Sequence, residues 1–424
     1  MAGGDQVAGG AVTGRAAAER LDAQDPLAPF RDRFVFDDPE TIYLDGNSLG
    51  RLPLATRERF SELTVQWGSE LVAGWHEWID LPERIGDLLA AGVLGARPGE
   101  VIVADSTTVN LFKLAGAVLD TRAGAMVTDA ENFPTDRYVL EGLGRLYRRE
   151  LHVFEAHRVD GPQPEDVERA CAGADVALVV LSQVAYRSGA LADIEQINRA
   201  AAPAPVLWDL SHSAGAVPVE LERRGVELAV GCTYKYLNAG PGAPAFLYVR
   251  EELQEDLRTP IQGWFGQRDQ FLMERPYDPA PGVRGFLAGT PPIIALVGVE
   301  EGAKLVAEAG IDRLRTKATA LTELIVAVHE ERLAPLGFRL GSPRDPARRG
   351  AHVSLAHDEA WPICRALIER AKVIPDFRRP DSIRLGVPPL YTRFVDVYDA
   401  LERLAVLVER GDYREVDDRP LRVT

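Results

Sequence analysis

Residues 205–242 read PVLWDLSHSAGAVPVELERRGVELAVGCTYKYLNAGPG, and this stretch indicates the fold. An apolar run over residues 206–208 ends in Asp209, and a second run over residues 228–233 leads to Lys235. We expect two strands with a helical segment between them. Because the carboxyl ends of strands line the ligand crevice of an open α/β sheet, a carboxylate and an amine are predicted to meet there.

This pair of side chains suits the cofactor pyridoxal phosphate. The lysine amine forms a Schiff base with the cofactor aldehyde, and the aspartate pairs with the protonated pyridine nitrogen, which keeps the ring an electron sink. Each residue also has a structural explanation when it is taken singly. Asp209 stands where aspartates often cap a helix, and lysines beside tyrosines, as at Lys235, are usually surface residues. The neighbouring motifs decide between the explanations.

The chain around this stretch alternates short apolar runs with segments of helical periodicity. Such alternation predicts an α/β fold with a mainly parallel, seven-stranded type of sheet covered by helices. The expected strands of this sheet are residues 101–105, 125–129, 151–156, 176–184, 205–210, 228–233 and 243–249. Further strands are expected at residues 338–342, 351–357, 372–377 and 382–387, in a smaller α+β domain.

The domain organisation is predicted as four consecutive parts. These are a disordered tail over residues 1–25, an N-terminal segment over 26–62 at the active-site mouth and small domain, a large cofactor-binding domain over 63–295, and the small domain over 296–424.

Residues 57–91 have helical periodicity. Trp67, Leu71, Trp75 and Trp78 recur at spacings of three and four residues, which places them on one helix face. We expect this stripe to lie in the core or at a dimer contact.

Composition excludes several classes of protein. The 424 residues carry a formal net charge of −16, which argues against nucleic acid or an anionic membrane as a partner. Cys171, Cys232 and Cys364 form no CxxC pair, which fits a reducing cytoplasm without structural disulfides. The histidines and cysteines show no metal-ligand spacing, and we find no apolar run long enough to span a membrane.

The blocks WDLSHSAG and CTYKYLNAGPG resemble kynureninases, pyridoxal-phosphate enzymes of the aspartate-aminotransferase fold type (fold type I). Five further blocks occur in family order along most of the chain: YLDGNSLGRLP (43–53), ENFPTDRY (131–138), QGWFGQ (262–267), GTPPI (289–293) and SIRLGVPPLY (382–391). The resemblance implies a hydrolase that cleaves L-kynurenine or 3-hydroxy-L-kynurenine into anthranilate or 3-hydroxyanthranilate and L-alanine. It also implies a cytoplasmic homodimer acting in tryptophan catabolism or NAD biosynthesis.

The resemblance also assigns residues to the site. The catalytic residues it implies are Lys235, Tyr234 and Asp209. The cofactor-binding residues are Thr107, Thr108, Phe133, Thr135, Asp136, Ser182, Asp209, His212, Tyr234, Lys235, Trp264 and Thr290. The substrate-binding residues are Asn47, Ser48, His76 and Arg384.

Several of these residues have a chemical reason for the role and a plain structural alternative. Free amides at the helix start after Ser106 suit phosphate, although a simple Ser/Thr N-cap is the commoner explanation of such a segment. Phe133 can stack on the pyridine ring, which adds about 0.5–1.5 kcal/mol, or pack as a hydrophobic staple. The phenol of Tyr234 can bind phosphate or act as an acid, or simply pack. Arg384 suits bidentate binding of an α-carboxylate, unless it is an exposed strand arginine.

Two roles rest on the resemblance almost entirely. The hydroxyl of Ser182 either reaches the cofactor phenolate oxygen or is satisfied within the protein. His76 lies off the tryptophan spacing and is predicted to face a cavity, although a lone histidine is usually structural.

Two rival functions are considered. A cysteine desulfurase-like lyase of the same fold type needs a mobile cysteine on a loop, whereas Cys364 lies in a helical pattern over residues 361–371. A cofactor-binding regulator without catalysis needs a basic DNA-binding module, which the sequence does not show.

Overall fold

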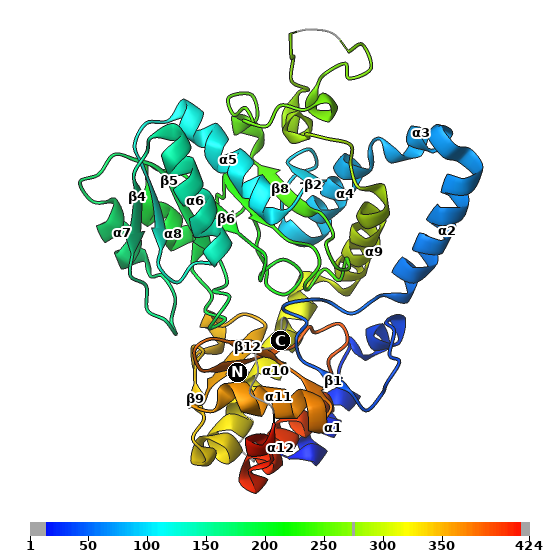
Figure 1. The fold of residues 1–424 in the computed structure, drawn as a ribbon, viewed down its shortest axis with the longest axis vertical. Helices are drawn as coiled ribbons and strands as arrows, with labels where there is room; N and C mark the ends of the chain where they lie inside the picture. The colour runs from blue at the N-terminus through cyan, green and yellow to red at the C-terminus, as the bar shows by residue number, and fades with distance from the viewer. Residues whose placement is uncertain (1–13, 274–275, 417–424) are drawn as a thin grey trace, which may run out of the picture.

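The computed structural model describes residues 14–273 and 276–416, and its larger part is built on a seven-stranded sheet (Figure 1). In spatial order the strands are β2 (Val101–Ala104), β8 (Ala245–Val249), β7 (Leu228–Gly231), β6 (Val206–Asp209), β5 (Val176–Ser182), β3 (Ala125–Asp129) and β4 (Leu151–Phe154). Neighbouring strands are parallel except β8, which runs antiparallel to β2 and β7. The predicted mainly parallel sheet is therefore confirmed.

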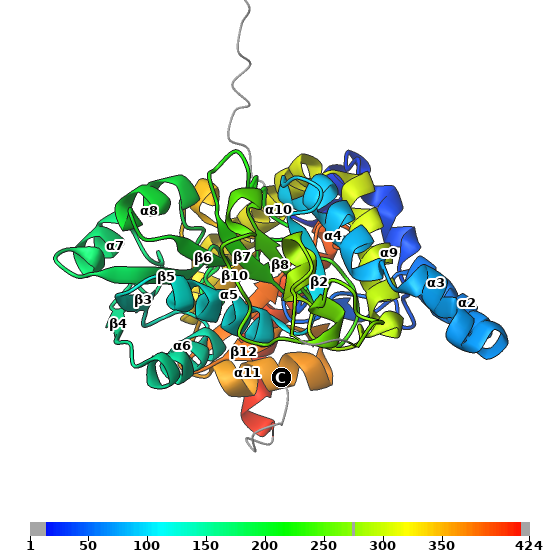
Figure 2. The same ribbon diagram turned by 90° about the horizontal axis from the view of Figure 1, so that it is seen from above.

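Helices cover both faces of this sheet because its strands are apolar on both sides. Figure 2 shows α5 and α6 on one face and α7 and α8 on the other. Alternate residues of one strand belong to different cores: Ile102 packs in the core with α5 and α6, whereas Val101 and Val103 pack in the core of the opposite face. The helices of this part are α2 (Leu54–Glu70), α3 (Trp75–Trp78), α4 (Leu81–Leu89), α5 (Thr107–Thr121), α6 (Pro134–Tyr147), α7 (Pro164–Cys171), α8 (Ile194–Ala201) and α9 (Ile293–Ala309).

The smaller part is an α+β unit built on a four-stranded antiparallel sheet. Its strand order is β12 (Asp376–Arg378), β13 (Ser382–Gly386), β10 (His352–Ala356) and β9 (Arg339–Leu340). Its helices are α1 (Arg15–Ala23), α10 (Ile311–Val328), α11 (Ala360–Arg370) and α12 (Phe394–Arg410). The N-terminal segment joins it, because β1 (Ile42–Tyr43) pairs in parallel with β11 (Val373–Ile374). One expected strand, residues 372–377, is thus divided between β11 and β12.

The boundary between the two parts differs from the expected one. Residues 295 and 296 fall inside α9, and Leu296 and Val306 of this helix belong to the core of the large sheet. Leu321 and Ile325 of α10 belong to the core of the small unit instead. We therefore propose that the connection runs through the start of α10.

The expected disordered tail over residues 1–25 is wrong from residue 15 onward. Arg15–Ala23 is helix α1, and Ala18 on it is fully buried in the core of the small unit. The carboxylate of Asp22 accepts hydrogen bonds from the amides of Phe394 and Val395, which begin α12, at 2.7 and 3.0 Å. Residues 1–13 lie outside the described residues.

Two other expectations are corrected. Residues 210–227 form successive turns without a helix, because Gly215 and Gly225 adopt positive φ and Pro218 interrupts the segment. The tryptophan stripe does not lie on one helix either. Helix α2 ends at Glu70, and Leu71 has φ of 52°, so Trp67 is exposed whereas Trp78 is buried.

Candidate active site

Asp209 and Lys235 lie at the same edge of the large sheet. Ser182 and Asp209 end β5 and β6 opposite each other in register, and Lys235 follows the neighbouring strand β7 by four residues. This arrangement of β5, β6 and β7 explains why the carboxylate and the amine lie at the carboxyl ends of neighbouring parallel strands, as the sequence predicts.

Asp209 is paired with a second carboxyl group. Its Oδ1 accepts a hydrogen bond from the amide of Ser211 at 2.7 Å. Asp136, in the first turn of α6, is 1% exposed, and burial together with the Asp209 carboxylate raises its pKa well above the usual range. Burial therefore favours the protonated form of Asp136, and a protonated carboxyl can donate a hydrogen bond to the neighbouring Asp209.

Lys235 contacts a neutral histidine. Its Nζ lies 3.0 Å from Nε2 of His212, which is buried. Burial, followed by the charge of Lys235, lowers the pKa of His212 well below its usual value, so the ring accepts the hydrogen bond from the amine. The ring centroids of Phe133 and Tyr234 lie 6.0 and 5.9 Å from Nζ. These four residues, predicted together, are adjacent.

Phe133 has one partly exposed face. It is 38% exposed and contacts the ring of Tyr186 edge-on, with centroids 5.3 Å apart. The neighbouring hydroxyl of Ser182 donates to Oδ1 of Asn132 at 2.7 Å, so the structural alternative for this hydroxyl is satisfied here. Thr135, in the first turn of α6, is half-buried.

Thr107 and Thr108 open helix α5, as the phosphate prediction requires. Ser106 is the N-cap residue, and its side chain accepts from the amide of Val109 at 3.3 Å. The N-cap explanation is confirmed, and phosphate binding stays a prediction, since a capped helix still presents first-turn amides without intrahelical partners. Thr108 is exposed and Thr107 half-buried.

Arg384 meets Asn47 and Ser48, as predicted for the substrate site. Its Nη2 donates to Oγ of Ser48 at 3.0 Å. The amide of Asn47, oriented with its oxygen toward the guanidinium, accepts from Nε at 2.8 Å and Nη2 at 3.1 Å. Arg384 is 1% exposed, which excludes the alternative of an exposed strand arginine.

Acidic residues that were not predicted surround this arginine. Asp376 lies opposite Arg384 in the β12–β13 register and forms ion pairs with it and with Arg378, the latter at 3.1 Å. Burial and the charge of Asp376 raise the pKa of Asp45 to about 7. Asp45 stands in the predicted block 43–53, but cross-strand register, which the sequence does not reveal, determines the place of Asp376.

Three predicted residues stand apart from this cluster. His76 on α3 and Thr290 are exposed, and Trp264 is 40% exposed against Phe265. Among the described residues, no hydrogen bond or ring contact joins these three to Lys235 or Arg384. In Figure 1 their segments lie at the upper end of the molecule, near α3 and between β8 and α9.

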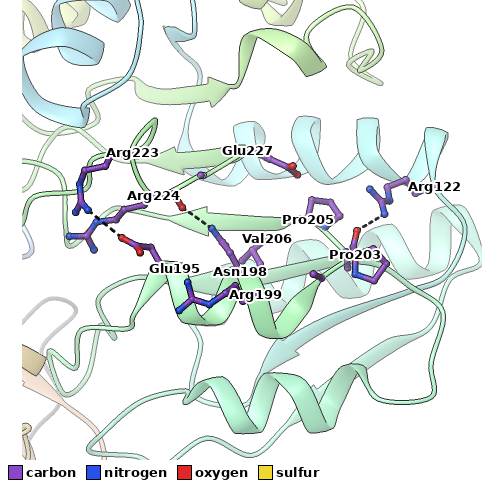
Figure 3. A pocket seen from close by; sticks show the side chains of 13 residues that line it. Arg122, Glu195, Asn198, Arg199, Pro203, Pro205, Val206, Arg223, Arg224 and Glu227 are labelled. Carbon is purple, nitrogen blue, oxygen red and sulfur yellow. Dashed lines mark hydrogen bonds and ion pairs between the residues drawn. The ribbon is translucent and has the colours of Figure 1, made fainter.

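A pocket of about 530 Å³ lies elsewhere (Figure 3). It is near Val206, which begins β6, whereas Asp209 ends that strand. Two of its arginines have partners: Arg122 donates to the carbonyl of Pro203 at 2.7 Å, and Arg223 lies 3.4 Å from Glu195. No predicted site residue lines it.

The structure also bears on metal binding, on membrane-spanning helices and on the position of Cys364. Within residues 14–273 and 276–416, no group of His, Cys, Asp and Glu side chains is arranged to hold a metal ion. Over the same ranges, no helix has the length and apolarity needed to cross a bilayer. Cys364 lies in α11 and is 1% exposed, so it lacks the mobile loop that the desulfurase reading requires.

Comparison with known proteins finds matches to kynureninases. Residues 314–404 match a family model described as the kynureninase C-terminal domain. Kynureninase from Pseudomonas fluorescens is 41% identical over 409 residues, which cover 93% of this chain and 95% of the relative. Kynureninase from Burkholderia pseudomallei (strain K96243) is 40% identical over 411 residues, with 94% and 97% covered.

Solved structures share the fold at lower identity. A cysteine desulfurase from Thermococcus onnurineus NA1 superposes with a TM-score of 0.74 at 18% identity and covers 88% of this chain and 95% of its own. A lysine-to-alanine mutant of C-DES, which has glycine covalently linked to its PLP cofactor, has a TM-score of 0.76 at 17% identity, with 87% and 97% covered. At these identities the likeness shows fold type I alone. The sequence identity extends over nearly the whole of both chains, and on that basis this protein belongs to the kynureninase family.

Proposed function

We propose that this protein is a pyridoxal 5′-phosphate-dependent hydrolase that cleaves L-kynurenine with water into anthranilate and L-alanine. The observation that carries this proposal is the placement of Lys235 beside neutral His212, near the Asp136–Asp209 pair. The direct test is to incubate the purified protein with kynurenine and to follow anthranilate fluorescence. No fluorescence from cofactor-saturated protein would refute the proposal.

The residues present fit the cofactor. Lys235 offers an amine for covalent attachment, and the Asp136–Asp209 pair offers one negative charge for the pyridine nitrogen. Nδ1 of His212 and Oδ2 of Asp136 are buried without partners in the described structure, as expected of groups at a ligand site. Thr107 and Thr108 offer helix-start amides for the phosphate. When bound, the cofactor supplies an electron sink for the substrate α-carbon.

Two side chains of this protein, Lys235 and Tyr234, then carry out different proton transfers. With cofactor and substrate bound, the amine of Lys235 would remove the proton from the substrate α-carbon. Burial raises the pKa of Tyr234 above its usual value, so its phenol keeps its proton and can donate it near the carbonyl that water attacks.

Charge favours the substrate carboxylate at Arg384. The guanidinium groups of Arg384 and Arg378 both pair with the carboxylate of Asp376, and the pKa of Asp45, raised to about 7, lessens the negative charge beside them. Asn47 and Ser48 orient Arg384 through its Nε and Nη2. The planar guanidinium can then bind the α-carboxylate of an amino-acid substrate.

Arg384→Lys should weaken kynurenine binding about tenfold or more while cofactor content stays unchanged, because lysine keeps the charge but loses the fork. The dissociation constant and the cofactor absorbance are the measurements. Arg339→Lys is the matched control, since Arg339 is an exposed strand arginine of the same sheet. An unchanged affinity in Arg384→Lys would show that this contact is wrong.

The protein acts as a homodimer in the cytoplasm. The support for a dimer is apolar surface on the projecting segment around α2, where Val65, Trp67, Leu71 and Val72 are 72, 57, 64 and 81% exposed (Figures 1 and 2). A second copy would cover it. The three free cysteines suit a reducing compartment. Sedimentation as a 46.4 kDa monomer would contradict the dimer.

In such a dimer, His76, Trp264 and Thr290 reach the site of the partner subunit, where His76 and Thr290 are placed near the substrate ring and Trp264 near the cofactor. The support is that all three are at least partly exposed and lie away from Lys235 within one chain.

We expect kynurenine to be preferred over 3-hydroxykynurenine by at most about a hundredfold. A buried ring hydroxyl without a hydrogen-bond partner costs about 1–3 kcal/mol of binding free energy. The side chain of Thr290 is short and β-branched, so it gives this hydroxyl little opportunity to form a hydrogen bond. Thr290→Asn, with a longer amide, should move the ratio of kcat/KM values toward the hydroxylated substrate. If the ratio stays the same, Thr290 serves only the cofactor phosphate. A wild-type preference for 3-hydroxykynurenine would overturn the prediction.

A further inference from the structure

The segment that follows β5 connects the large part of the chain to the small unit. We call residues 185–190 the bridging turn. The carbonyl of Gly189 accepts from the amide of Gly350 at 2.8 Å, and the carbonyl of Ser188 accepts from Oγ of Ser342 at 2.5 Å. Because both donors belong to the small unit, the position of the bridging turn depends on that unit, although the turn continues a strand of the large sheet.

Tyr186 in the bridging turn contacts one residue of each predicted binding site. Its ring packs edge-on against Phe133, with centroids 5.3 Å apart and an interplanar angle of 83°. Its carbonyl oxygen accepts a hydrogen bond from Nη1 of Arg384 at 2.5 Å. Phe133 is predicted to stack on the cofactor ring, and Arg384 is predicted to bind the substrate carboxylate. Tyr186 therefore joins the two sites through its side chain and its backbone.

Arg187 holds Tyr186 and both parts of the chain with three different nitrogens. Its Nη2 donates to the phenol oxygen of Tyr186 at 2.9 Å, and its Nε donates to Oε2 of Glu131 at 3.2 Å. Its Nη1 donates to the carbonyl of Arg379, which follows β12 in the small unit. Glu131 precedes Phe133 by two residues in the large part. The guanidinium therefore links the segment of Phe133, the bridging turn and the small unit.

A purely structural role for Arg187 would be that of an ordinary ion pair. Its side chain is 21% exposed and that of Glu131 is 32% exposed, and a partly exposed pair of this kind contributes only about 0–1 kcal/mol to stability. The contacts of Arg187 go beyond one pair, because its three acceptors belong to three segments. Only the planar fork of an arginine offers nitrogens to all three at once.

We propose that Arg187 is a positioning residue that, through Tyr186, fixes the spacing between Phe133 and Arg384. A substrate that reaches the cofactor while its carboxylate lies on Arg384 needs this spacing, because binding at two points depends on the distance between them. This inference rests on the proposed function, in which Phe133 contacts the cofactor ring and Arg384 contacts the substrate carboxylate.

Steady-state kinetics of Arg187 variants test the positioning role. Arg187→Met keeps a long side chain without the guanidinium and should raise KM for kynurenine about tenfold, with kcat changed less than about twofold and cofactor content unchanged. Arg187→Lys keeps the charge on a single nitrogen and should fall between the wild type and Arg187→Met.

Arg158→Met is the matched control. Arg158 lies 3.7 Å from Asp381 and so also joins the large part to the small unit, but its ion pair does not involve Tyr186. KM should stay unchanged in this control. A lower melting temperature with unchanged KM in Arg187→Met would assign Arg187 to stability alone and overturn the proposal. An equal rise of KM in Arg158→Met would overturn it as well.

Two binding measurements need no turnover. L-Alanine, the amino-acid product, is titrated into the holoprotein, and the visible circular dichroism of the bound pyridoxal phosphate reports the surroundings of its ring. Arg187→Met should weaken L-alanine binding about tenfold and change the circular dichroism. Glu131→Gln should cause part of this loss, and the double variant should be no weaker than Arg187→Met, because the two residues act through one contact. Additive losses, or L-alanine binding unchanged in Arg187→Met, would contradict the proposal.

The same measurements separate this inference from the proposed function. A wild-type protein that binds pyridoxal phosphate and L-alanine but does not cleave kynurenine would refute the proposed function alone, and the L-alanine titrations would still decide the role of Arg187. A wild-type protein that does not bind pyridoxal phosphate would overturn both.

Discussion

Replacing Lys235 with alanine should lower kcat for kynurenine at least about 10³-fold, which is roughly 4 kcal/mol of barrier. The change removes both the amine that attaches the cofactor and the base that takes the α-proton. His212, whose Nε2 lies 3.0 Å from Nζ, is a poor substitute, because burial lowers its pKa well below the usual value and makes its imidazole a weak base. A small added amine should restore part of the rate, since it supplies the missing base.

The measurement combines kinetics with chemical labelling. Borohydride reduction of the wild-type holoenzyme, followed by peptide mapping, should place the cofactor on Lys235. Lys372→Ala is the matched control, because Lys372 is an exposed lysine paired with Asp38 and Glu40 on the small unit. A label on another lysine, or substantial turnover by Lys235→Ala, would contradict the assignment of Lys235 as the residue that attaches the cofactor and takes the α-proton.

Asp209→Asn should lower kcat at least about tenfold, or roughly 1.4 kcal/mol, while the cofactor still binds. The asparagine keeps the shape and can still accept from the amide of Ser211, as Oδ1 of Asp209 does at 2.7 Å. It removes the negative charge of the Asp136–Asp209 pair, and with it the partner that keeps the pyridine nitrogen protonated.

Asp136→Asn is the informative comparison for this prediction. Burial and Asp209 already keep Asp136 protonated, so an amide there changes no charge and should cost less than Asp209→Asn. Both variants should be assayed at saturating kynurenine with cofactor occupancy read from absorbance. Full occupancy with unchanged kcat in Asp209→Asn would refute the role, and a larger loss in Asp136→Asn would reverse the assignment of the charge.

Much of the fold was predictable because strand signals are local. The apolar runs at residues 101–105, 125–129 and 176–184 became β2, β3 and β5 with their ends shifted by at most two residues. The segment after Asp209 was mispredicted because its apolar residues suggested helical spacing. Gly215 and Gly225 there adopt positive φ, and a backbone angle of this kind is not visible in a hydrophobic pattern.

Part of the predicted site follows from the sequence alone, and part depends on contacts between elements that are far apart in the chain. Strand ends placed Asp209 and Lys235 at the same edge of the sheet. Arg384, Asn47 and Ser48, which were each predicted to bind substrate, are in contact, and their binding role stays a prediction. The roles of His76, Trp264 and Thr290 stay predictions, because within one chain these residues lie away from Lys235 and Arg384.

The sequence by itself determined the sheet, the amine and carboxylate at its carboxyl edge, and the family, because all three depend on residues that are close in the chain. Only the tertiary structure decided that Asp136 contacts Asp209, that Asp376 lies against Arg384, and that His352 lies beside His212. The two members of each pair belong to separate elements. Strand register and packing between the two parts of the chain, which no local pattern encodes, bring them together.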